Sequence, residues 1–211
     1  MAKNNWKRER KESIQQAKKF LVVVEGCVTE KEYIEAVKRS RQMKSVQVLV
    51  ETGHTDPIGI VNKAKERKTA AHRSDPFDEV WCVFDTETKL TQLARNGLQQ
   101  AMDTARRAKV NVALSNPCFE IWLLWHKQDQ TGWISSDNAQ SRCKYLGLTA
   151  EKHIVNASLL IQNYYEDAKA RAVKLDTTHN NNIGTTIPAQ RNPSSDMHKL
   201  IDSIYKAFPQ R

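Results

Sequence analysis

Long apolar runs are missing from this sequence. The longest are Leu21–Val24 and Ile121–Trp125, and both are far shorter than the roughly 20 residues that a helix needs to cross a bilayer. Residues 1–19 are polar and charged, without the apolar segment of a secretory signal. We therefore expect a protein with no membrane-spanning segment and no export signal.

Cysteine is also scarce, with four residues at positions 27, 82, 118 and 143. No two of them form a CxxC pair, and no histidine lies at metal-binding spacing from any of them. Neither a zinc ribbon nor a disulfide framework is therefore expected. Scattered cysteines with mainly apolar neighbours are typical of core positions in a reduced compartment, so we expect a cytoplasmic protein.

Nucleotide-binding and hydrolase motifs are absent as well. The sequence contains no GxxxxGK[ST] motif, no GxGxxG motif after a strand and no GxSxG motif. These absences argue against a P-loop NTPase, a dinucleotide enzyme and an α/β-hydrolase. If ATP takes part in the activity, a partner protein has to bind it.

Positive charge, by contrast, is abundant. The formal net charge is +9 and the sequence pI is about 9.4. This favours a polyanionic partner such as nucleic acid, because counterions released from phosphates drive binding. A basic protein with a solvated surface would show the same composition. The basic segment 1–18 supplies four candidate nucleic-acid contacts: Lys7, Arg8, Arg10 and Lys11.

Apolar runs rich in β-branched residues alternate with helical patterns over the first half of the chain. The predicted strands are 19–25, 46–51, 80–85 and 110–115, and the predicted helices are 29–41, 57–72 and 90–108. This alternation predicts an α/β fold with a parallel four-stranded sheet flanked by helices. A Thr29-x-x-Glu32 capping box is expected to open the first helix.

After Asn116-Pro117 the pattern becomes helical. The predicted helices are 118–126, 137–146, 152–175 and one that begins near Pro193, with a polar loop at 178–192. The whole pattern divides the chain into three predicted parts: a basic N-terminal arm (1–18), an α/β core (19–126) and a helical extension packed on the core (127–211).

Acidic residues at the ends of predicted strands are the most informative feature. Glu25 ends the first strand and is followed by Gly26, while Asp85 ends the third strand and Glu87 lies two residues further on. Ligands of parallel sheets bind beyond the carboxyl ends of the strands, and carboxylate clusters suit Mg²⁺ or Mn²⁺. The three acids therefore predict a metal site, although acids also commonly end strands for local structural reasons.

Five further residues are candidates for the same site or for its substrate. Glu120 follows the proline turn after the fourth strand, but an acid in the first turn of a helix is also favoured by the helix dipole. Lys89 and His126 could hold a phosphate or protonate a leaving oxygen, although a lone histidine on an apolar helix is usually a core residue. Arg191 and His198 flank the start of the last helix and are candidates for nucleic-acid binding.

Four segments resemble those of a known family. VVVEGCVTEKEY (22–33) resembles the first toprim motif, and VWCVFDTET (80–88) resembles the second. SNPCFEIWLLWH (115–126) and NPSSDMHKL (192–200) resemble segments of RloB-like proteins. The resemblance covers most of the chain. It implies a toprim-type nuclease that uses Mg²⁺ or Mn²⁺, belongs to a phage-defence locus and in some loci acts with a partner ATPase.

The sequence departs from the toprim pattern at one position. The second motif is usually Asp-x-Asp, whereas this chain has Asp85-Thr86-Glu87. Because glutamate is one methylene longer, the second carboxylate is expected to bind metal less directly, which leaves the number of metals open.

The leading hypothesis is a metal-dependent endonuclease that cuts RNA or DNA, in anti-phage defence. The alternative is a catalytically inactive nucleic-acid-binding or regulatory subunit of a defence complex. A strand-joining activity is disfavoured, because it would normally need a further domain or a tyrosine nucleophile. The sequence does not distinguish RNA from DNA and predicts no oligomeric state.

Overall fold

A five-stranded mixed sheet forms the centre of the computed structural model. The structure describes residues 18–26, 28–44, 46–50, 56–71, 73–86, 92–181 and 190–209. In sheet order the strands are β2 (Val46–Val50), β1 (Phe20–Val24), β3 (Glu79–Asp85), β4 (Asn111–Asn116) and β7 (Ser194–Ser195). The first four are parallel to one another, as the sequence predicted, and the short β7 is antiparallel to β4.

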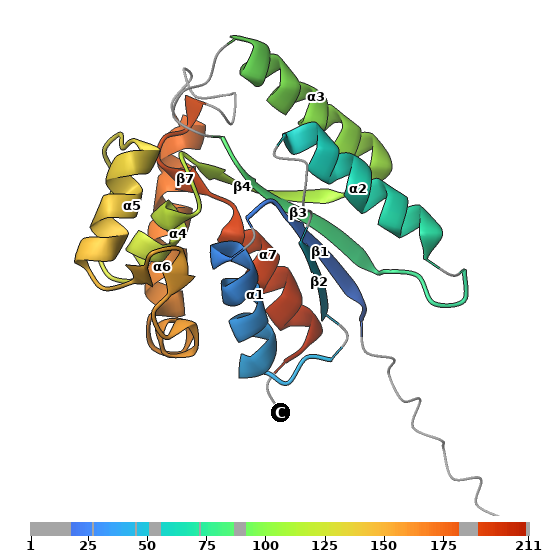
Figure 1. The fold of residues 1–211 in the computed structure, drawn as a ribbon, viewed down its shortest axis with the longest axis horizontal. Coiled ribbons are helices and arrows are strands. Elements are labelled where there is room, and N and C mark those ends of the chain that lie inside the picture. The colour runs from blue at the N-terminus through green and yellow to red at the C-terminus, as the bar shows by residue number, and fades with distance from the viewer. Residues whose placement is uncertain are drawn as a thin grey trace, which may run out of the picture.

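Helices cover both faces of the sheet (Figure 1). One face is covered by α1 (Thr29–Ser40) and α7 (Met197–Ala207), and the other by α2 (Pro57–Ala70) and α3 (Gln92–Ala108). The remaining helices lie on the side of α1 and α7: α4 (Glu120–Trp125), α5 (Ser136–Tyr145) and α6 (Ala157–Asn181). None of the helices within the described ranges has the length and apolar character to span a membrane.

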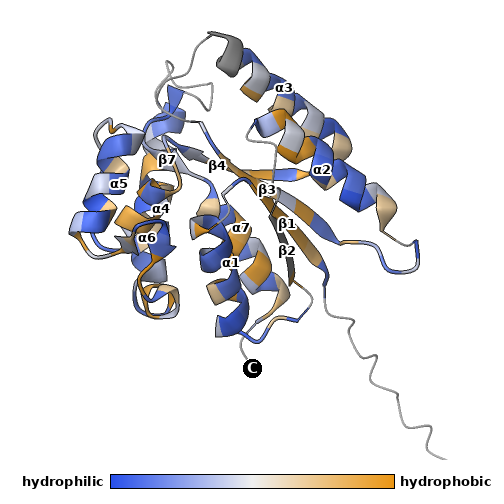
Figure 2. Ribbon diagram, viewed as in Figure 1, coloured by the Kyte–Doolittle hydropathy of each residue, from blue (hydrophilic) through white to orange (hydrophobic). Residues whose placement is uncertain are grey.

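The buried strand β1 explains why the sheet has two hydrophobic layers. All five of its residues are buried. Phe20, Val22 and Val24 belong to the cluster that includes α1, α4, α6 and α7, whereas Leu21 and Val23 belong to the cluster of α2 and α3. Side chains alternate between the faces of a strand, and a parallel strand covered on both sides is apolar throughout. Figure 2 shows this as apolar colour on the central strands.

The segment after α5 differs from the prediction. A helix was expected from residue 152, but the chain first forms a small hairpin of β5 (Thr149–Ala150) and β6 (His153–Ile154). Glu151 and Asn156 adopt positive φ angles of 55° and 56°, which turn the chain within the hairpin and again after it. The Asn156 side chain then accepts a hydrogen bond from Leu159 N. As a result α6 begins at Ala157, and it extends to Asn181, into the segment predicted as a loop.

The predicted capping box at the start of α1 is wrong. Val28 is the N-cap residue, and no side chain caps the helix. Thr29 Oγ1 instead donates a hydrogen bond to Lys152 O (2.8 Å), and Glu32 Oε2 accepts one from Ile154 N (2.8 Å). Both side chains therefore fix the β5–β6 hairpin against the first turn of α1.

The last helix also begins later than predicted. It starts at Met197 and not near Pro193, because Ser194 and Ser195 form β7 and pair with the end of β4. Ser195 Oγ lies 3.1 Å from Ser115 Oγ, and both side chains are buried. The C-terminal part of the chain thus contributes a strand to the sheet, while the division at residue 126 remains a prediction.

Candidate functional site

Two of the predicted acids lie side by side at the carboxyl edge of the sheet. Glu25 directly follows β1, and its backbone N–H donates to Val83 O of β3 (3.1 Å). Asp85 ends β3, and its backbone N–H lies 3.4 Å from Glu25 Oε2. Because β1 and β3 are adjacent parallel strands, their carboxyl ends bring the two acids together, as strand order alone would require.

Glu120 joins these residues from the next strand connection. The chain leaves β4, turns at Asn116 and Pro117, and enters α4 at Glu120. The backbone N–H of Phe119 donates to Asp85 Oδ2 (3.1 Å), which ties the start of α4 to the end of β3. Glu120 is close enough to contribute to the raised pKa of Asp85. The structure therefore places Glu120 with Glu25 and Asp85.

A fourth acid, Glu30, was missed by the sequence analysis. It lies in the first turn of α1, and only 8% of its surface is exposed. Its carboxylate covers Gly26 so closely that a Cβ atom at that position would collide with it. Its position in the sequence could have indicated this role, because the first helical turn after a parallel strand faces the carboxyl edge of the sheet. We call Glu25, Glu30, Asp85 and Glu120 the acid cluster.

Burial and mutual repulsion oppose ionisation within the acid cluster. Burial raises the pKa of Asp85 well above its usual value, and the nearby carboxylates of Glu30, Glu120 and Glu25 raise it further. Burial likewise raises the pKa of Glu30 to about 7, with added repulsion from Glu120 and Glu25 and partial relief from a hydrogen bond to its own backbone. A divalent cation would reverse this balance, since opposite charge favours the ionised carboxylate.

The donor set fits a hard divalent cation. Asp85 Oδ1 is buried and has no hydrogen-bond partner among the described residues, and the same holds for Thr86 Oγ1. An unpartnered buried carboxylate oxygen is costly unless a cation or donor satisfies it, and oxygen ligands are those that Mg²⁺ and Mn²⁺ prefer. In the described ranges, no group of three or more His, Cys, Asp and Glu side chains is already placed to hold an ion. Glu87, the remaining predicted ligand, lies outside these ranges.

Cysteines near the acid cluster behave as core residues. Cys82, Cys118 and Cys143 are all buried free thiols, which confirms the predicted core role for these three. Cys143 Sγ donates to Glu120 O at 3.4 Å. Burial raises the pKa of the Cys118 and Cys143 thiols, and the nearby carboxylate of Glu120 adds to the effect. Cys118 and Cys143 therefore lie beside Glu120 as neutral thiols, whereas Cys82 belongs to the hydrophobic layer of α2 and α3.

His126 lies in the core and not at the acid cluster surface. Its exposed fraction is 1%, and both ring nitrogens are engaged: Nδ1 lies 2.9 Å from Trp122 O and Nε2 lies 3.0 Å from Tyr33 Oη. Burial lowers its pKa to about 4, so the ring is neutral at physiological pH. This environment favours a packing role over proton transfer to a substrate. Lys89, the other candidate proton donor, lies outside the described residues.

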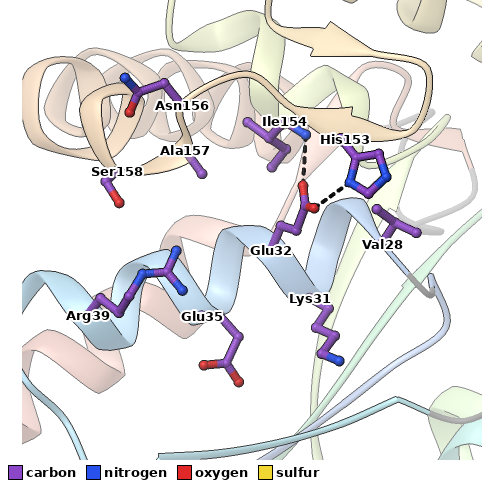
Figure 3. A pocket seen from close by; sticks show the side chains of 10 residues that line it. All are labelled: Val28, Lys31, Glu32, Glu35, Arg39, His153, Ile154, Asn156, Ala157 and Ser158. Atoms are coloured by element: carbon purple, nitrogen blue, oxygen red, sulfur yellow. Dashed lines mark hydrogen bonds and ion pairs between the residues drawn. The ribbon is translucent and has the colours of Figure 1, made fainter.

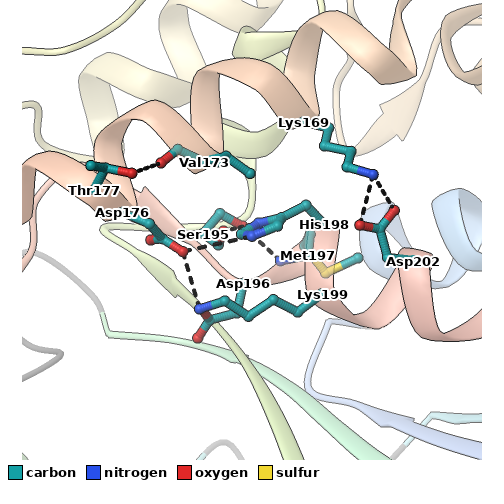
Figure 4. Close-up of polar contacts among 10 residues, drawn as sticks. All are labelled: Lys169, Val173, Asp176, Thr177, Ser195, Asp196, Met197, His198, Lys199 and Asp202. Atoms are coloured by element: carbon teal, nitrogen blue, oxygen red, sulfur yellow. Dashed lines mark hydrogen bonds and ion pairs between the residues drawn. The ribbon is translucent and has the colours of Figure 1, made fainter. Parts of the chain in front are cut away.

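The candidates at the start of α7 lie in a second polar cluster (Figure 4). His198 is buried, with Nδ1 3.1 Å from Ser195 O and Nε2 3.6 Å from Asp176 Oδ2. Burial lowers the pKa of His198 while Asp176 opposes the shift. Lys199 bridges Asp176 (3.1 Å) and Asp196. These contacts join α6 to α7, and the burial of His198 favours that structural role over nucleic-acid binding.

The structure does not test the other predicted nucleic-acid contacts. Arg191 is described and half-buried. Lys7, Arg8, Arg10 and Lys11 lie outside the described residues. Their role stays a prediction.

Comparison with known proteins identifies the family. No curated protein and no solved structure matches the chain. The sequence model of the family described as RloB-like protein matches residues 20–204, which include the whole acid cluster and every described strand and nearly all of α7. This chain is a member of the RloB-like protein family.

Proposed function

We propose that this protein is a divalent-metal-dependent nuclease that cuts phosphodiester bonds in RNA or DNA at the acid cluster. The observation that carries the proposal is the environment of Asp85. The residue is half-buried, but its Oδ1 atom is buried and has no hydrogen-bond partner within the described ranges, and the carboxylates of Glu30, Glu120 and Glu25 are close enough to raise its pKa. A fold does not gain stability from such an arrangement, and strongly perturbed carboxyls at the carboxyl edge of a sheet are typical of functional sites.

The cluster suits phosphodiester cleavage in particular. A divalent cation held there supplies positive charge that offsets the negative charge developing on the attacked phosphate. Asp85 is fixed for this role by the hydrogen bond from Phe119 N to Oδ2, and Oδ1 remains for the cation. Glu25 is oriented by its contact with Asp85 N.

Glu30 has the properties of the proton acceptor. Burial raises its pKa to about 7 in the metal-free protein, and a carboxyl beside the site that is not itself a metal ligand can take a proton from an attacking water. Its carboxylate lies across Gly26, in the first turn of the helix that follows β1. Glu25 is the other carboxyl that could take this proton.

The cellular role follows from family membership as a further part of the proposal. RloB-like membership supports a place in anti-phage defence, in the cytoplasm and in some loci beside a partner ATPase. The net charge of +9 supports a nucleic-acid substrate, because a basic protein gains affinity from phosphate neutralisation.

One observation favours a second candidate function. Glu87 stands where the toprim pattern usually has a second aspartate, and a weakened metal site would leave a nucleic-acid-binding or regulatory subunit without turnover. The two candidates differ in one testable property, which is metal-dependent cleavage.

A cleavage panel tests the proposal. Purified protein is incubated with tRNA, single-stranded DNA and duplex DNA, each with Mg²⁺, Mn²⁺ or EDTA. We expect at least one substrate to be cut with metal and none with EDTA, and Glu25→Gln to abolish the cutting without changing the circular dichroism spectrum. Glu66→Gln, an exposed acid on α2 that pairs with Lys63, is the matched control. Intact substrates under every metal condition would favour the regulatory subunit.

A further inference from the structure

Positive charge gathers where α2 and α3 end. Residues 63–70 and 103–109, which form these ends, contain seven lysines and arginines but only two acids, which gives a net charge of +5. The two helices lie side by side over one face of the sheet (Figure 1). Lys68 Nζ joins their ends, because it donates to Ala108 O (3.0 Å) and to Lys109 O (2.6 Å). The cations of the two helices therefore lie next to each other.

The acids of this region are already paired. Each acid on the two helix ends, and the one in the five residues after α2, binds a basic side chain: Glu66 binds Lys63, Asp103 binds Arg106, and Asp75 binds Lys19. Within the described ranges, four cations of the helix ends are exposed and form no ion pair: Lys65, Arg67, Arg107 and Lys109. We call these four residues the α2–α3 basic surface.

The charge of this surface exceeds what the fold neutralises. Burial lowers the pKa of Lys68, and the positive charge of Lys109 lowers it further, so the neighbouring cations repel one another. A helix dipole ordinarily stabilises cations in the last turn, but Lys68 already binds the carbonyl groups at the end of α3. A polyanion would offset the remaining charge.

The composition of the surface favours nucleic acid over a protein or a membrane. The large apolar side chains that are exposed among the described residues lie between positions 133 and 173, and none of them is on α2 or α3. A protein interface has an apolar core, and a helix that binds a membrane inserts an apolar face. Contacts of lysine and arginine with backbone phosphates need neither.

This excess of positive charge is local. The groove between α1 and the start of α6, with a volume of about 610 Å³, is also lined by cations (Figure 3). There Lys31 and Arg39 are balanced by two acids, Glu32 and Glu35. The ends of α2 and α3 therefore differ from this groove in their net charge.

The α2–α3 basic surface lies at the edge of the sheet opposite the acid cluster. Lys109 comes just before β4, whereas the acid cluster lies beyond the carboxyl ends of the strands. The 14 residues of α2 span roughly 21 Å between the two edges. Base pairs rise 3.4 Å each, so a duplex of roughly six base pairs or more covers this distance.

We propose that the α2–α3 basic surface binds the backbone phosphates of a long nucleic acid at a distance from the acid cluster. Lys65, Arg67, Arg107 and Lys109 are its phosphate contacts, and they anchor the nucleic acid without touching the bond that is cut. The inference rests on the proposed function for the place of the cut.

Two matched double variants test the surface. Lys65→Gln/Lys109→Gln removes two of its cations, whereas Lys144→Gln/Lys174→Gln removes two exposed lysines from α5 and α6, on the other side of the sheet. Binding of fluorescein-labelled duplex DNA and of labelled tRNA is measured in EDTA over a series of salt concentrations. Each phosphate contact on duplex DNA contributes about 0.9 to the slope of log K against log salt.

The surface variant should lower the magnitude of the slope on duplex DNA by about 1.8, and the control variant should leave it unchanged. Arg67→Gln/Arg107→Gln should lower the slope by the same amount. Both surface variants should keep the wild-type urea midpoint, because none of the four cations forms an ion pair within the described part of the chain.

Three results would overturn the inference. The first is an unchanged slope in both surface variants, and the second is an equal loss in the control variant. The third is binding of labelled poly-glutamate that is tighter than binding of duplex DNA and is lost in the surface variants. That result would assign the surface to an acidic protein.

The same experiment separates the surface from the proposed activity. Because EDTA prevents metal-dependent turnover, binding is measured whether or not the protein is a nuclease. If the wild type cuts its substrate, the surface variants should raise KM and keep kcat, since a distant contact binds the ground state and the transition state alike. Cleavage by the wild type together with normal binding by the surface variants would refute the surface alone. Binding that depends on the surface, without any cleavage, would refute the nuclease alone.

Discussion

Replacing Glu30 with glutamine should stabilise the metal-free protein above neutral pH. Glu30 is buried, and its pKa is raised from 4.5 to about 7 by burial and by the carboxylates of Glu120 and Glu25. Ionisation of Glu30 is therefore less favourable in the folded protein than in the unfolded chain. Glutamine has nearly the same shape as the protonated acid but cannot ionise, so the variant avoids this cost.

The magnitude and pH range follow from the two pKa values of Glu30. Below about pH 4.5 the carboxyl is protonated in both the folded and the unfolded state, so Glu30→Gln should change the free energy of unfolding little. Between 4.5 and about 7 the unfolded chain loses its proton while the folded protein keeps it, and the wild type loses stability as the pH rises. Above that range the difference is constant at roughly 3 kcal/mol, because each pKa unit corresponds to 1.36 kcal/mol.

Urea unfolding in EDTA at a series of pH values measures this effect. The difference in unfolding free energy between Glu30→Gln and wild type should grow with pH and then level off near neutrality. Glu66→Gln, whose side chain is 62% exposed, should show no such growth. Equal stability of Glu30→Gln and wild type at about pH 8 would refute the account of the acid cluster as a set of mutually repelling buried carboxyls.

Three further predictions concern activity and binding. Gly26→Ala should displace the Glu30 carboxylate and slow cleavage by roughly tenfold, which corresponds to about 1.4 kcal/mol in the activation barrier, while the unfolding midpoint stays nearly unchanged. A variant that cuts at the wild-type rate would show that the position of Glu30 does not matter for cleavage. Asp85→Ala should abolish cleavage at every metal concentration, whereas the activity of Glu87→Ala should be partly restored by Mn²⁺, because Mg²⁺ is stricter in its octahedral geometry. Loss of cleavage in Glu87→Ala together with normal cleavage in Asp85→Ala would contradict this order. Deleting residues 1–12 should weaken nucleic-acid binding and flatten its salt dependence, and an unchanged salt slope would exclude the arm as a phosphate contact.

The parts of the fold that sequence predicts well are those with a strong hydrophobic pattern. β1 and β3 are parallel strands covered on both faces, so they appear as uninterrupted apolar runs. The four-stranded parallel arrangement follows from their alternation with helices. By contrast β5, β6 and β7 have two residues each, and two residues carry no periodicity that a pattern could detect.

The acid cluster was predicted only in part, for a similar reason. Glu25, Asp85 and Glu120 follow strands, and strand order places strand ends together. Glu30 lies in the first turn of a helix, between Thr29 and Glu32, which match a capping box. This match suggested a purely structural role for the helix start, so Glu30 was not considered as a site residue. The contacts that occupy Thr29 and Glu32 come from a hairpin more than a hundred residues later in the chain, which local sequence cannot reveal.

Burial also distinguishes between roles that a sequence motif allows for the same residue. His126 is the last residue of a segment that resembles RloB-like proteins, and the sequence allowed either a catalytic or a core role. Its neighbours Tyr33 and Trp122 come from α1 and α4, and their rings contact it edge to face. Only the packing of these two helices shows that the ring is enclosed.

The central claim is that the acid cluster binds a divalent cation, with Asp85 as one of its ligands. The most direct test is a titration of the metal-free protein with Mn²⁺, followed by electron paramagnetic resonance of the free ion, with no substrate present. We expect saturable binding to the wild type and to Glu66→Gln, and binding at least roughly tenfold weaker in Asp85→Asn, since a lost ligand removes at least 1.4 kcal/mol. Equal Mn²⁺ affinity of Asp85→Asn and wild type would contradict the claim.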